Sequence, residues 1–332
     1  MSNGETPSGA PTVTVAVPVL NEERHLSACL DSIVAQNYQG ELEILVVDGG
    51  STDSTRSIAS SYPGVRLLHN PRRLQSAGLN IALEAAKGDV LVRVDGHSTI
   101  APDFVERSVD ALRSTGAAMV GAGLRPSPGV TWIQRAIAAA LVSPLGAGPA
   151  AFRLGGPSRW VDTVFLSTFW TAAAREVGGY VEDPQLNEDP EFAYRLAAKG
   201  GVWYEEGLDS TYQPRETLVA LARQYYRYGG LRAGTVRRHP GVLAPRQVAA
   251  PLLLVALFTP WRRAALAAYA LLIGGVASRK LAKDPGASAG LLLVLPSMHF
   301  PWSVGFLVGL ARPLLRSHAR PTATTGERRP RV

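Results

Sequence analysis

Two aspartates of this chain close short apolar runs, at positions where a carboxylate can meet a ligand. Asp48 follows residues 44–47, and Asp95 follows residues 90–94. Both runs are rich in β-branched residues and are ended by glycine, which is typical of buried parallel strands. Open α/β sheets bind their ligands at the carboxyl ends of such strands. Because His97 adds a second metal ligand on the turn after Asp95, the pair predicts a nucleotide-sugar site.

The residues after Asp48 indicate what the first aspartate could do. Asp48 precedes Gly49-Gly50, and its carboxylate could hydrogen-bond the imide of a uracil or a ribose. Asp53, five residues on, either holds the loop or contacts the ribose. The alternative for Asp48 is a turn-forming residue before two glycines. The second aspartate at a strand end favours the ligand site.

The sequence Asp95-x-His97 combines a hard carboxylate with an imidazole. Mn²⁺ or Mg²⁺ would accept the carboxylate, and Mn²⁺ tolerates the imidazole better. Such an ion would offset the charge of a diphosphate leaving group. The alternative is a capped loop with a surface histidine.

Two adjacent carboxylates, Glu188 and Asp189, precede a helix with Pro190 in its first turn. Transfer of a sugar to a hydroxyl group needs a base. One carboxylate would take the acceptor proton while the other positions the acceptor. The alternative is an ordinary helix start with acidic residues in its first turn.

A basic helix later in the chain carries residues that could bind the nucleotide-sugar. Gln224 and Arg227 lie on one helical face, at i and i+3. Arginine can grip a diphosphate bidentately, and Tyr228 can stack on a sugar ring. A basic amphipathic helix resting on a membrane is an alternative that is compatible with this role. Arg72 and Arg73 could also reach the diphosphate, although a solvated pair is their default interpretation.

Alternating strands and helices position these residues. Strands are expected at 12–20, 42–47, 65–69, 89–94 and 117–122. Asn21 is expected to cap the first helix, and Pro102 to open the helix at 102–114. Further helices are expected at 54–60 and 75–86. This alternation predicts an α/β fold with a doubly wound parallel sheet. Beyond it we expect a helix near 131–141, a strand at 161–171, and helices at 190–199 and 215–229.

Composition and charge separate the two parts of the chain. The 332 residues are long enough for one large α/β domain plus an appendage. Residues 217–332 carry 17 of the 34 Lys and Arg residues but two of the 27 acids. A basic and apolar region suggests an anionic membrane surface or phosphates. Nucleic acid is discounted because long uncharged stretches separate the arginines. The single cysteine, Cys29, excludes an internal disulfide and is expected in the core.

Three uncharged stretches follow, at 247–261, 264–278 and 285–311. The last has 27 residues and is long enough to cross a bilayer. The first two have 15 residues each, about 22 Å as helix, so two interfacial or re-entrant helices fit as well as two spans. A soluble hydrophobic subdomain is the alternative. Six arginines after residue 311 predict a cytoplasmic tail.

Taken in order, the motifs resemble those of one enzyme family. They are Pro18-Val19-Leu20-Asn21-Glu22-Glu23, Asp48-Gly49-Gly50-Ser51-Thr52-Asp53, Asp95-Gly96-His97, Glu188-Asp189 and Gln224-x-x-Arg227-Tyr228. Over residues 12–232 the chain resembles family 2 inverting glycosyltransferases with the GT-A fold. It resembles most the succinoglycan-type bacterial exopolysaccharide glycosyltransferases, which carry Asp-x-His in place of Asp-x-Asp.

This resemblance implies a role for each motif. Asp189 would be the catalytic base, with Glu188 beside it, and Asp95 with His97 would hold a Mn²⁺ or Mg²⁺ ion. The implied donor-binding residues are Pro18, Asn21, Glu22, Asp48, Asp53, Arg73, Gln224, Arg227 and Tyr228. The sugar would be transferred with inversion by direct displacement.

Three departures from the family pattern qualify the resemblance. Tyr228 stands where processive members carry tryptophan, which argues against a polymerase. Residues 78–80 read Gly-Leu-Asn where the family often has Ala-Arg-Asn, so Arg72 or Arg73 would replace the missing arginine. The histidine of Asp-x-His leaves the choice of metal open.

We therefore expect a disordered leader at 1–11, a GT-A domain at 12–232, membrane-associated helices at 233–311 and a basic cytoplasmic tail at 312–332. The enzyme would move a sugar from a UDP-sugar, or less favourably a GDP-sugar, to a polyprenyl-diphosphate-linked saccharide in cell-surface polysaccharide synthesis. Its catalytic domain would face the cytoplasm at the inner membrane.

Three alternatives to this activity stay open. They are a polyprenyl-phosphate sugar synthase, a non-catalytic nucleotide-binding scaffold of a membrane complex, and a nucleotidyltransferase. The last would want a glycine-rich loop after the first strand, where this chain has Asn21-Glu22-Glu23.

Overall fold

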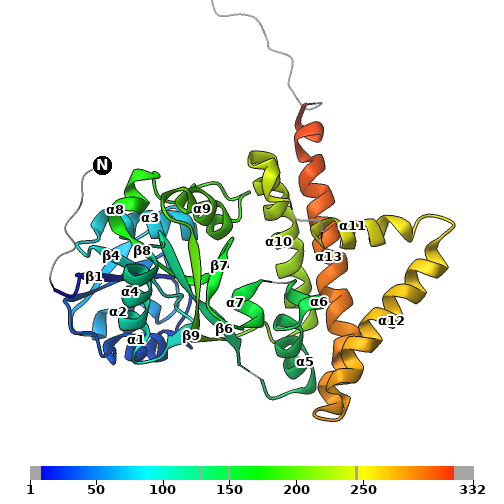
Figure 1. The fold of residues 1–332 in the computed structure, drawn as a ribbon, viewed down its shortest axis with the longest axis horizontal. Helices are drawn as coiled ribbons and strands as arrows, with labels where there is room; N and C mark the ends of the chain where they lie inside the picture. The colour runs from blue at the N-terminus through cyan, green and yellow to red at the C-terminus, as the bar shows by residue number, and fades with distance from the viewer. Residues whose placement is uncertain (1–8, 128, 149, 244–245, 318–332) are drawn as a thin grey trace, which may run out of the picture.

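The computed structural model describes residues 9–317 apart from residues 128, 149 and 244–245. Within these residues a sheet domain lies beside a group of long helices (Figure 1). Most of the expected leader and of the expected tail lies outside the described residues.

A nine-stranded sheet forms the centre of the sheet domain. Its strands are β1 Val13–Val19, β2 Leu42–Asp48, β3 Val65–His69, β4 Val90–Arg93, β5 Ser98–Ile100, β6 Met119–Pro126, β7 Arg159–Val161, β8 Phe165–Trp170 and β9 Val202–Tyr212. Their order is β3-β2-β1-β4-β8-β6-β9-β5, with β7 paired to β9.

The first half of the sheet is parallel, as the alternating pattern predicted. β3, β2, β1 and β4 pair with one another in parallel, and Val19 of β1 lies level with Asp48 of β2. β8 then enters antiparallel between β4 and β6, which makes the sheet mixed. The expected single strand at 161–171 is two strands, β7 and β8. The chain leaves the sheet between them, close to a bulge between Val120 and Ala122 in the β6–β8 pairing.

β5 and β9 were not predicted. β9 carries Glu205, Glu206 and Asp209 within its eleven residues, and these acids hide the apolar alternation that identifies a strand. β9 nevertheless pairs with three strands, β5, β6 and β7. β9 therefore completes the part of the sheet beyond β6, which the sequence analysis did not predict.

Helices cover both faces of the sheet, because successive side chains of a strand point to opposite faces. The helices of this domain are α1 Leu26–Val34, α2 Thr55–Ser61, α3 Gln75–Ala85, α4 Phe104–Thr115, α8 Thr171–Glu176 and α9 Glu188–Leu196, which a short 3₁₀ turn, Ala197–Lys199, extends. Val15 and Val17 pack with α1, α2 and α4, whereas Ala16 packs with α3, α8 and α9. Cys29 is fully buried in the first of these layers, as expected.

Three predicted helix starts are wrong. α1 begins at Leu26, with His25 rather than Asn21 as its N-cap. Asn21 has φ 56° and belongs to the loop after β1. α4 begins after Pro102, with Asp103 at its N-cap. α9 begins at Glu188, earlier than the expected residue 190, so both candidate acids belong to its first turn.

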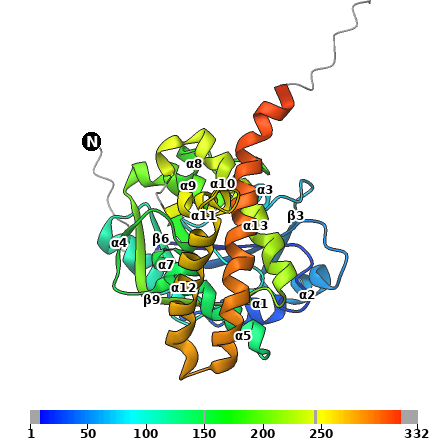
Figure 2. The same ribbon diagram turned by 90° about the vertical axis from the view of Figure 1, so that its right-hand side faces the viewer.

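The long helices form a second layer beside the sheet domain (Figures 1 and 2). They are α10 Leu218–Arg238, α11 Arg246–Ala256, α12 Arg262–Leu281 and α13 Pro285–Ser317, with a 3₁₀ turn at Pro240–Val242. α5 Trp132–Leu141, at the expected place, lies between the sheet and α13 together with the short helices α6 Pro144–Ala147 and α7 Ala151–Leu154. Buried side chains of α5, α10, α12 and α13 form one apolar cluster.

Glycines bring α10 and α13 into backbone contact. A Cβ atom on Gly229 would collide with the carbonyl of Trp302, and one on Gly305 would collide with the carbonyl of Tyr226. A Cβ on Gly309 would stand 2.7 Å from the Cβ of Ala233. Small residues permit such close approach of two helices. α10, which carries Gln224 and Arg227, is thereby fixed along α13, the more apolar of the two long helices that could span a membrane.

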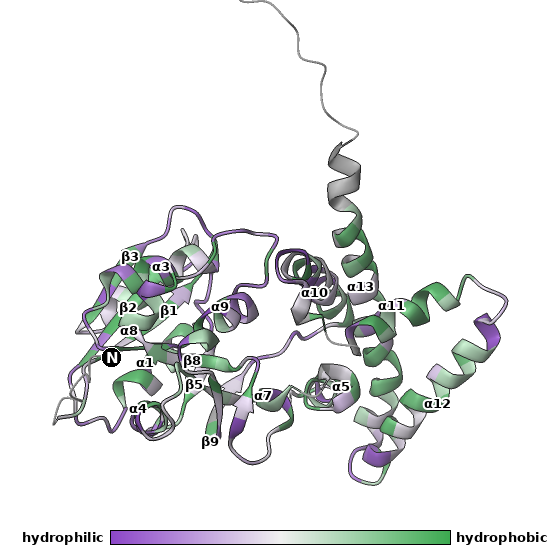
Figure 3. Ribbon diagram, turned by 45° about the horizontal axis from the view of Figure 1, so that its top comes forward, coloured by the Kyte–Doolittle hydropathy of each residue, from purple (hydrophilic) through white to green (hydrophobic). Residues whose placement is uncertain are grey.

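Several apolar side chains of α11, α12 and α13 are exposed. The ribbons of these helices are largely green, the colour of hydrophobic residues, in Figure 3. By length and composition, two of the described helices could cross a membrane, 262–281 and 285–311. In these windows 11% and 39% of residues are buried, respectively. The outer surface of the second layer is therefore apolar over much of its length.

Candidate active site

Asp48 lies at the end of β2 and binds the backbone of its own loop. Its oxygens accept hydrogen bonds from the N–H groups of Gly50 at 3.1 Å and Ser51 at 3.0 Å, and Arg56 lies 3.7 Å away. Gly50 has φ 83°, which glycine adopts without strain. These contacts agree with the turn-forming alternative. They also hold Asp48 at the carboxyl edge of the sheet, where a donor-binding role needs it.

Asn21 and Asp53 join the end of β1 to the loop after β2. The Thr52 N–H donates to Asn21 Oδ1 at 2.9 Å, and the Glu23 N–H donates to Asp53 Oδ2 at 3.2 Å. Asp53 Oδ1 also accepts from the Thr55 N–H at 3.0 Å. Of the two roles expected for Asp53, these contacts support the loop-holding one. Asn21 ties the same loop instead of capping a helix.

Arg73 faces the Asp48 loop, whereas Arg72 does not. The Arg73 guanidinium nitrogens lie 3.3 Å from the position of a Cβ on Gly50. Arg72 instead forms an ion pair with Glu182. Pro18 lies on β1, level with Val47 of β2. Arg73 therefore stays the stronger candidate of the pair for the diphosphate.

The centre of the site is an arginine held between two aspartates. Arg93 Nε donates to Asp95 Oδ1 at 3.0 Å, and Arg93 Nη1 forms an ion pair with Asp189. Gln75 Nε2 lies 3.3 Å from the same oxygen of Asp95. Arg93 is 5% exposed. The structure thus brings together the predicted metal ligand and the predicted base through a residue that the sequence analysis did not single out.

The two acids at the start of α9 share a partly desolvated environment. Burial and the adjacent Asp189 raise the pKa of the Glu188 carboxyl, against the charges of Arg93 and Arg227. Burial also raises the pKa of Asp189, and the charge of Arg93 opposes that shift. The Asp189 side chain remains 37% exposed, so an acceptor can still reach it. A raised pKa suits a group that must take up a proton during a reaction.

His97 pairs with Glu22, another predicted site residue. His97 Nδ1 lies 3.0 Å from Glu22 Oε1, and its ring meets the Tyr212 ring edge to face at 5.5 Å between centroids. Burial lowers the pKa of His97, but the hydrogen bond with Glu22 and the charge of Asp95 outweigh it and raise the pKa. A carboxylate on one ring nitrogen orients the other nitrogen, as it does for metal-binding histidines.

The two candidate metal ligands, Asp95 and His97, fit a divalent cation that is also bound by a substrate. Among the described residues, no hydrogen bond or ion pair occupies Asp95 Oδ2 or His97 Nε2. Within the same residues, no group of three or more His, Cys, Asp or Glu could hold a metal ion. Mg²⁺ and related ions are often held by one or two protein carboxylates plus substrate phosphates. Asp95 and His97 match that pattern.

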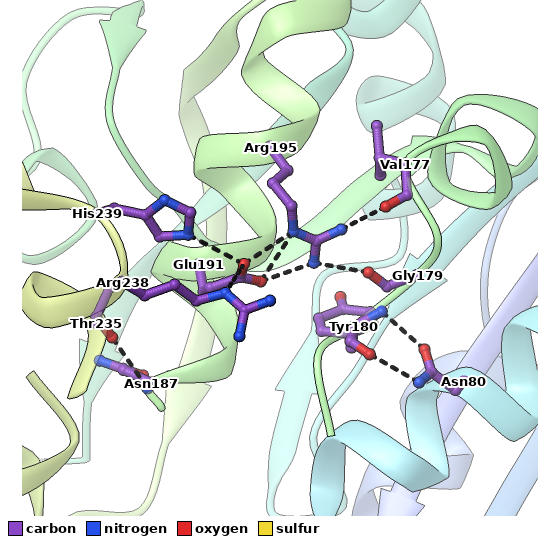
Figure 4. A network of polar contacts seen from close by, with 10 residues as sticks. All are labelled: Asn80, Val177, Gly179, Tyr180, Asn187, Glu191, Arg195, Thr235, Arg238 and His239. Atoms are coloured by element: carbon purple, nitrogen blue, oxygen red, sulfur yellow. Dashed lines mark hydrogen bonds and ion pairs between the residues drawn. The ribbon is translucent and has the colours of Figure 1, made fainter. Parts of the chain in front are cut away.

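A buried polar network around Glu191 holds α9, the helix that begins with these acids (Figure 4). Glu191 is fully buried and binds Arg195 at 2.7 Å and His239 at 3.3 Å. Arg195 also donates to the carbonyls of Val177 at 2.6 Å and Gly179 at 2.7 Å. Because His239 follows α10, this network ties the helix that carries Asp189 to the second layer.

On α10, Gln224 turns toward tyrosines. Gln224 Nε2 donates to the Tyr228 hydroxyl at 2.9 Å and lies 3.5 Å from the Tyr212 hydroxyl. Tyr212 thus connects this helix to His97. Arg227 is exposed, and its charge acts on Glu188. The predicted Gln224 element therefore lies beside the site, although the Tyr228 hydroxyl already has a partner.

Arg93, Tyr212 and Gln75 are the site residues that sequence reasoning missed. Arg93 had a readable signal, since it is the charged residue inside the otherwise apolar run 90–94. A buried arginine needs paired carboxylates nearby. Tyr212 and Gln75 carried no such signal, because Tyr212 lies on the unpredicted β9 and Gln75 at the start of α3.

The fold and this site place the chain in a known class of enzyme. Residues 14–175 match the model of glycosyl transferase family 2. The chain is 33% identical over 309 residues to the succinoglycan biosynthesis protein ExoA of Rhizobium meliloti (strain 1021), which covers 88% of this chain and 93% of that protein. The chain belongs to glycosyltransferase family 2 and is a glycosyltransferase.

Two further relatives extend the comparison. The mannosyltransferase PcManGT from Pyrobaculum calidifontis, in complex with GDP-Man and Mn²⁺, superposes with a TM-score of 0.56 at 22% identity, covering 94% of this chain and 89% of that chain. This likeness confirms the GT-A fold. The chain is 22% identical over 238 residues, 68% of its length and 74% of the relative's, to the dolichyl N-acetyl-alpha-D-glucosaminyl phosphate 3-beta-D-2,3-diacetamido-2,3-dideoxy-beta-D-glucuronosyltransferase of Methanococcus voltae.

Proposed function

We propose that this enzyme transfers a sugar from a UDP-sugar, with inversion, to a lipid-linked saccharide during cell-surface polysaccharide synthesis. The observation that carries the proposal is the bridge from Asp95 through Arg93 to Asp189. An acceptor hydroxyl at Asp189 would lie close to a donor whose diphosphate is held at Asp95. A direct displacement needs both substrates together, with a base on the acceptor.

A divalent cation, Mn²⁺ or Mg²⁺, would be held by Asp95 and His97. When bound, it would neutralise charge on the leaving diphosphate. Arg73 would add a cation beside the Asp48 loop, and Asp48 would contact the nucleotide. Glu22 would orient His97 through the hydrogen bond to its Nδ1. The Mn²⁺ in the complex of the Pyrobaculum mannosyltransferase supports this choice of ion.

The acceptor side of the proposal rests on α10 and its neighbours. Arg227 is exposed beside Glu188 and is free to meet an anionic group. Arg153 on α7 has a buried Nη1 without a hydrogen-bond partner among the described residues. Its charge reaches Tyr225 and Tyr228, whose pKa values are raised by burial. Two arginines beside an apolar helix layer suit an acceptor that joins phosphates to a lipid.

The apolar outer surface of α12 and α13 would contact the inner membrane, with the sheet domain in the cytoplasm. The basic charge of residues 217–332 would favour anionic lipid. The division at 12–232 and 233–311 is part of this proposal, although α10 runs across residue 232. The names of the relatives from Rhizobium and Methanococcus support a glycan product and a lipid-bound acceptor. No nucleic acid is expected as a partner.

A donor panel tests the proposal. The detergent-solubilised full chain would receive UDP- and GDP-sugars, with Mn²⁺ or Mg²⁺ and with a membrane lipid extract as acceptor. We expect metal-dependent release of nucleoside diphosphate from one UDP-sugar, and losses of about 10²-fold or more in Asp95→Ala and Asp189→Asn. Asp110→Asn, which changes an exposed acid on α4, should keep full activity. Absence of release with every donor would contradict the proposal and favour a nucleotide-binding scaffold.

The same assay separates the second activity, a polyprenyl-phosphate sugar synthase. A lipid phosphate is already ionised at neutral pH and needs little deprotonation. Asp189→Asn would then cost much less than Asp95→Ala. A loss of similar size in both variants supports a hydroxyl acceptor.

A further inference from the structure

Arg93 is an unusual residue for its position in the fold. It ends β4, whose other residues are Val90, Leu91 and Val92, and it is 5% exposed. Asp95 follows two residues after the strand ends, and the hydrogen bond of 3.0 Å from Arg93 Nε to Asp95 Oδ1 brings the two side chains together at the carboxyl edge of the sheet.

The guanidinium joins two parts of the site that are distant in the sequence. Its Nε binds Asp95 at 3.0 Å, two residues away, and its Nη1 binds Asp189, 96 residues away. A planar guanidinium presents several donors in a fixed fork, whereas a lysine ammonium acts as one point charge. Arginine can therefore fix the relative positions of both carboxylates, and lysine cannot fully replace it.

Charge balance also singles out Arg93. Asp95, Glu188 and Asp189 place three carboxylates in one partly desolvated region, where their mutual repulsion favours protonation. Arg93 is the fully desolvated cation among them, and its charge opposes the raised pKa of both Glu188 and Asp189. Arg227, the other cation that acts on Glu188, is exposed. Arg93 therefore favours the charged form of Asp189, which is the form that can accept a proton.

We propose that Arg93 is a positioning residue that aligns the base Asp189 with the donor site at Asp95 and keeps that base ready to accept a proton. This inference rests on the proposed function, because it assigns to Asp189 the proton of the acceptor. A merely structural ion pair is the competing explanation. The positioning role and the structural ion pair predict different effects when the charge and the geometry of residue 93 are changed separately.

Two substitutions separate charge from geometry. Arg93→Gln removes the charge, and Arg93→Lys keeps the charge without the fork. We expect kcat to fall about 10²-fold or more in Arg93→Gln and less in Arg93→Lys, with little change in the KM for the donor. The acid limb of the pH profile of kcat/KM should move up by about one unit or more in Arg93→Gln. It should stay near its wild-type position in Arg93→Lys.

Binding of Mn²⁺ alone gives a readout that does not depend on turnover. Removal of a cation 3.0 Å from Asp95 Oδ1 should leave Mn²⁺ affinity, followed by electron paramagnetic resonance, at least as tight as in the wild type. Arg66→Gln is the matched control, since it breaks an ion pair with Glu43 that is 45% exposed on the arginine side. We expect it to change neither kcat nor the pH profile.

The outcomes are distinct. Weaker Mn²⁺ binding in Arg93→Gln, or an acid limb that does not move, would overturn the inference and leave a structural ion pair. Full activity in Arg93→Gln would overturn it as well. A wild-type enzyme that transfers no sugar would instead contradict the proposed function, and Mn²⁺ binding would show whether the Asp95 site exists without it.

Discussion

The sheet domain and the helix layer hold their residues in place by opposite means. In the sheet domain, Asp95, Arg93 and Asp189 are fixed by charged hydrogen bonds in partly buried positions. In the helix layer, α10 and α13 meet through glycine and apolar side chains. Residues 1–216 are acidic overall and residues 217–332 are basic. Polar contacts thus hold the candidate site residues together, whereas the helix layer keeps an apolar exterior.

Glu191 lies where the two regions meet. It is on α9, two residues after Asp189, and it binds His239, which follows α10. A change on either side of this contact tests whether the two regions are separable. The following variants run from the largest expected effect to the smallest.

Charges on the outer surface of α12 should weaken the proposed membrane binding without harming the site. Leu271 is 78% exposed and Leu272 is 53% exposed. Replacing both by aspartate should weaken membrane partitioning by about 5 kcal/mol, since each acid costs about 2.5–3.5 kcal/mol in the bilayer centre. Co-sedimentation with anionic liposomes measures this loss.

Donor hydrolysis in detergent should stay within about two-fold of the wild type, because both leucines are exposed on α12 and lie outside the candidate site. The matched control places aspartate at Val34 and Val130, which are also exposed but lie outside α11–α13. Equal liposome binding by the α12 variant and the wild type would show that another surface meets the membrane.

Removal of Glu191 should destabilise the junction most among the polar changes. Glu191→Ala leaves Arg195 without the carboxylate that it binds at 2.7 Å. Loss of one partner of a buried ion pair costs about 3 kcal/mol. Denaturant unfolding measures it, with Glu176→Gln as control, because Glu176 pairs with Lys199 at an exposed position. A loss below about 1 kcal/mol would mean that the two regions are held together elsewhere.

The contribution of Glu191 should also depend on pH in one direction. Burial alone would raise its pKa, but Arg195 and His239 lower it below the ordinary value of 4.5. A lowered pKa in the folded state stabilises the protein above the unfolded-state value, and this contribution disappears as the pH falls through the folded-state value. The stability difference between wild type and Glu191→Gln should therefore shrink below about pH 4.5. Thermal midpoints of both proteins between pH 7 and pH 3 measure this.

The glycine contact between α10 and α13 gives a smaller effect. A side chain at Gly305 would meet the backbone of Tyr226, so Gly305→Leu should cost about 2 kcal/mol through overpacking. Gly275→Leu on α12 is the control, because nothing lies within 4 Å of a Cβ there. Thermal unfolding compares the two. Equal midpoints for both variants would show that the close approach of α10 to α13 is not needed for stability.

The sequence predicted the parallel half of the sheet well, because its apolar runs keep a strict pattern and end at Asp48 and Asp95. It also located the acids at the start of α9. It failed at Asn21, where a hydrogen bond from Thr52 holds a loop instead of a helix cap. Asn21 has the side-chain chemistry for either role, and only the position of the neighbouring loop decides.

The remaining failures concern contacts between distant segments. The pairing of Arg93 with Asp189 spans 96 residues, and no local pattern records it. The position of β8 between β4 and β6 likewise depends on pairing between distant segments, which no local sequence pattern records. Residues 123–160 contain α6 and α7, but their Gly, Pro and Ala content leaves no helical period to read.

The smallest effect is expected at the hydrogen bond between Gln224 and Tyr228. Tyr228→Phe removes a hydroxyl that accepts from Gln224 at 2.9 Å, which should cost about 1 kcal/mol of stability. Gln224 keeps the more distant Tyr212 hydroxyl at 3.5 Å, so the loss should not grow further. Tyr226→Phe is the control on the same helix, where the ring is 40% exposed.

Kinetics then decide which region Tyr228 serves. If its hydroxyl only braces Gln224 within the helix layer, Tyr228→Phe changes stability and leaves the KM values for donor and acceptor unchanged. If Tyr228 contacts a sugar, as its place in the motif predicts, the KM rises several-fold while kcat changes little, because uniform binding is lost. A fall in kcat alone would contradict both roles. It would instead indicate that Tyr228 acts on the candidate site through Gln224, Tyr212 and His97.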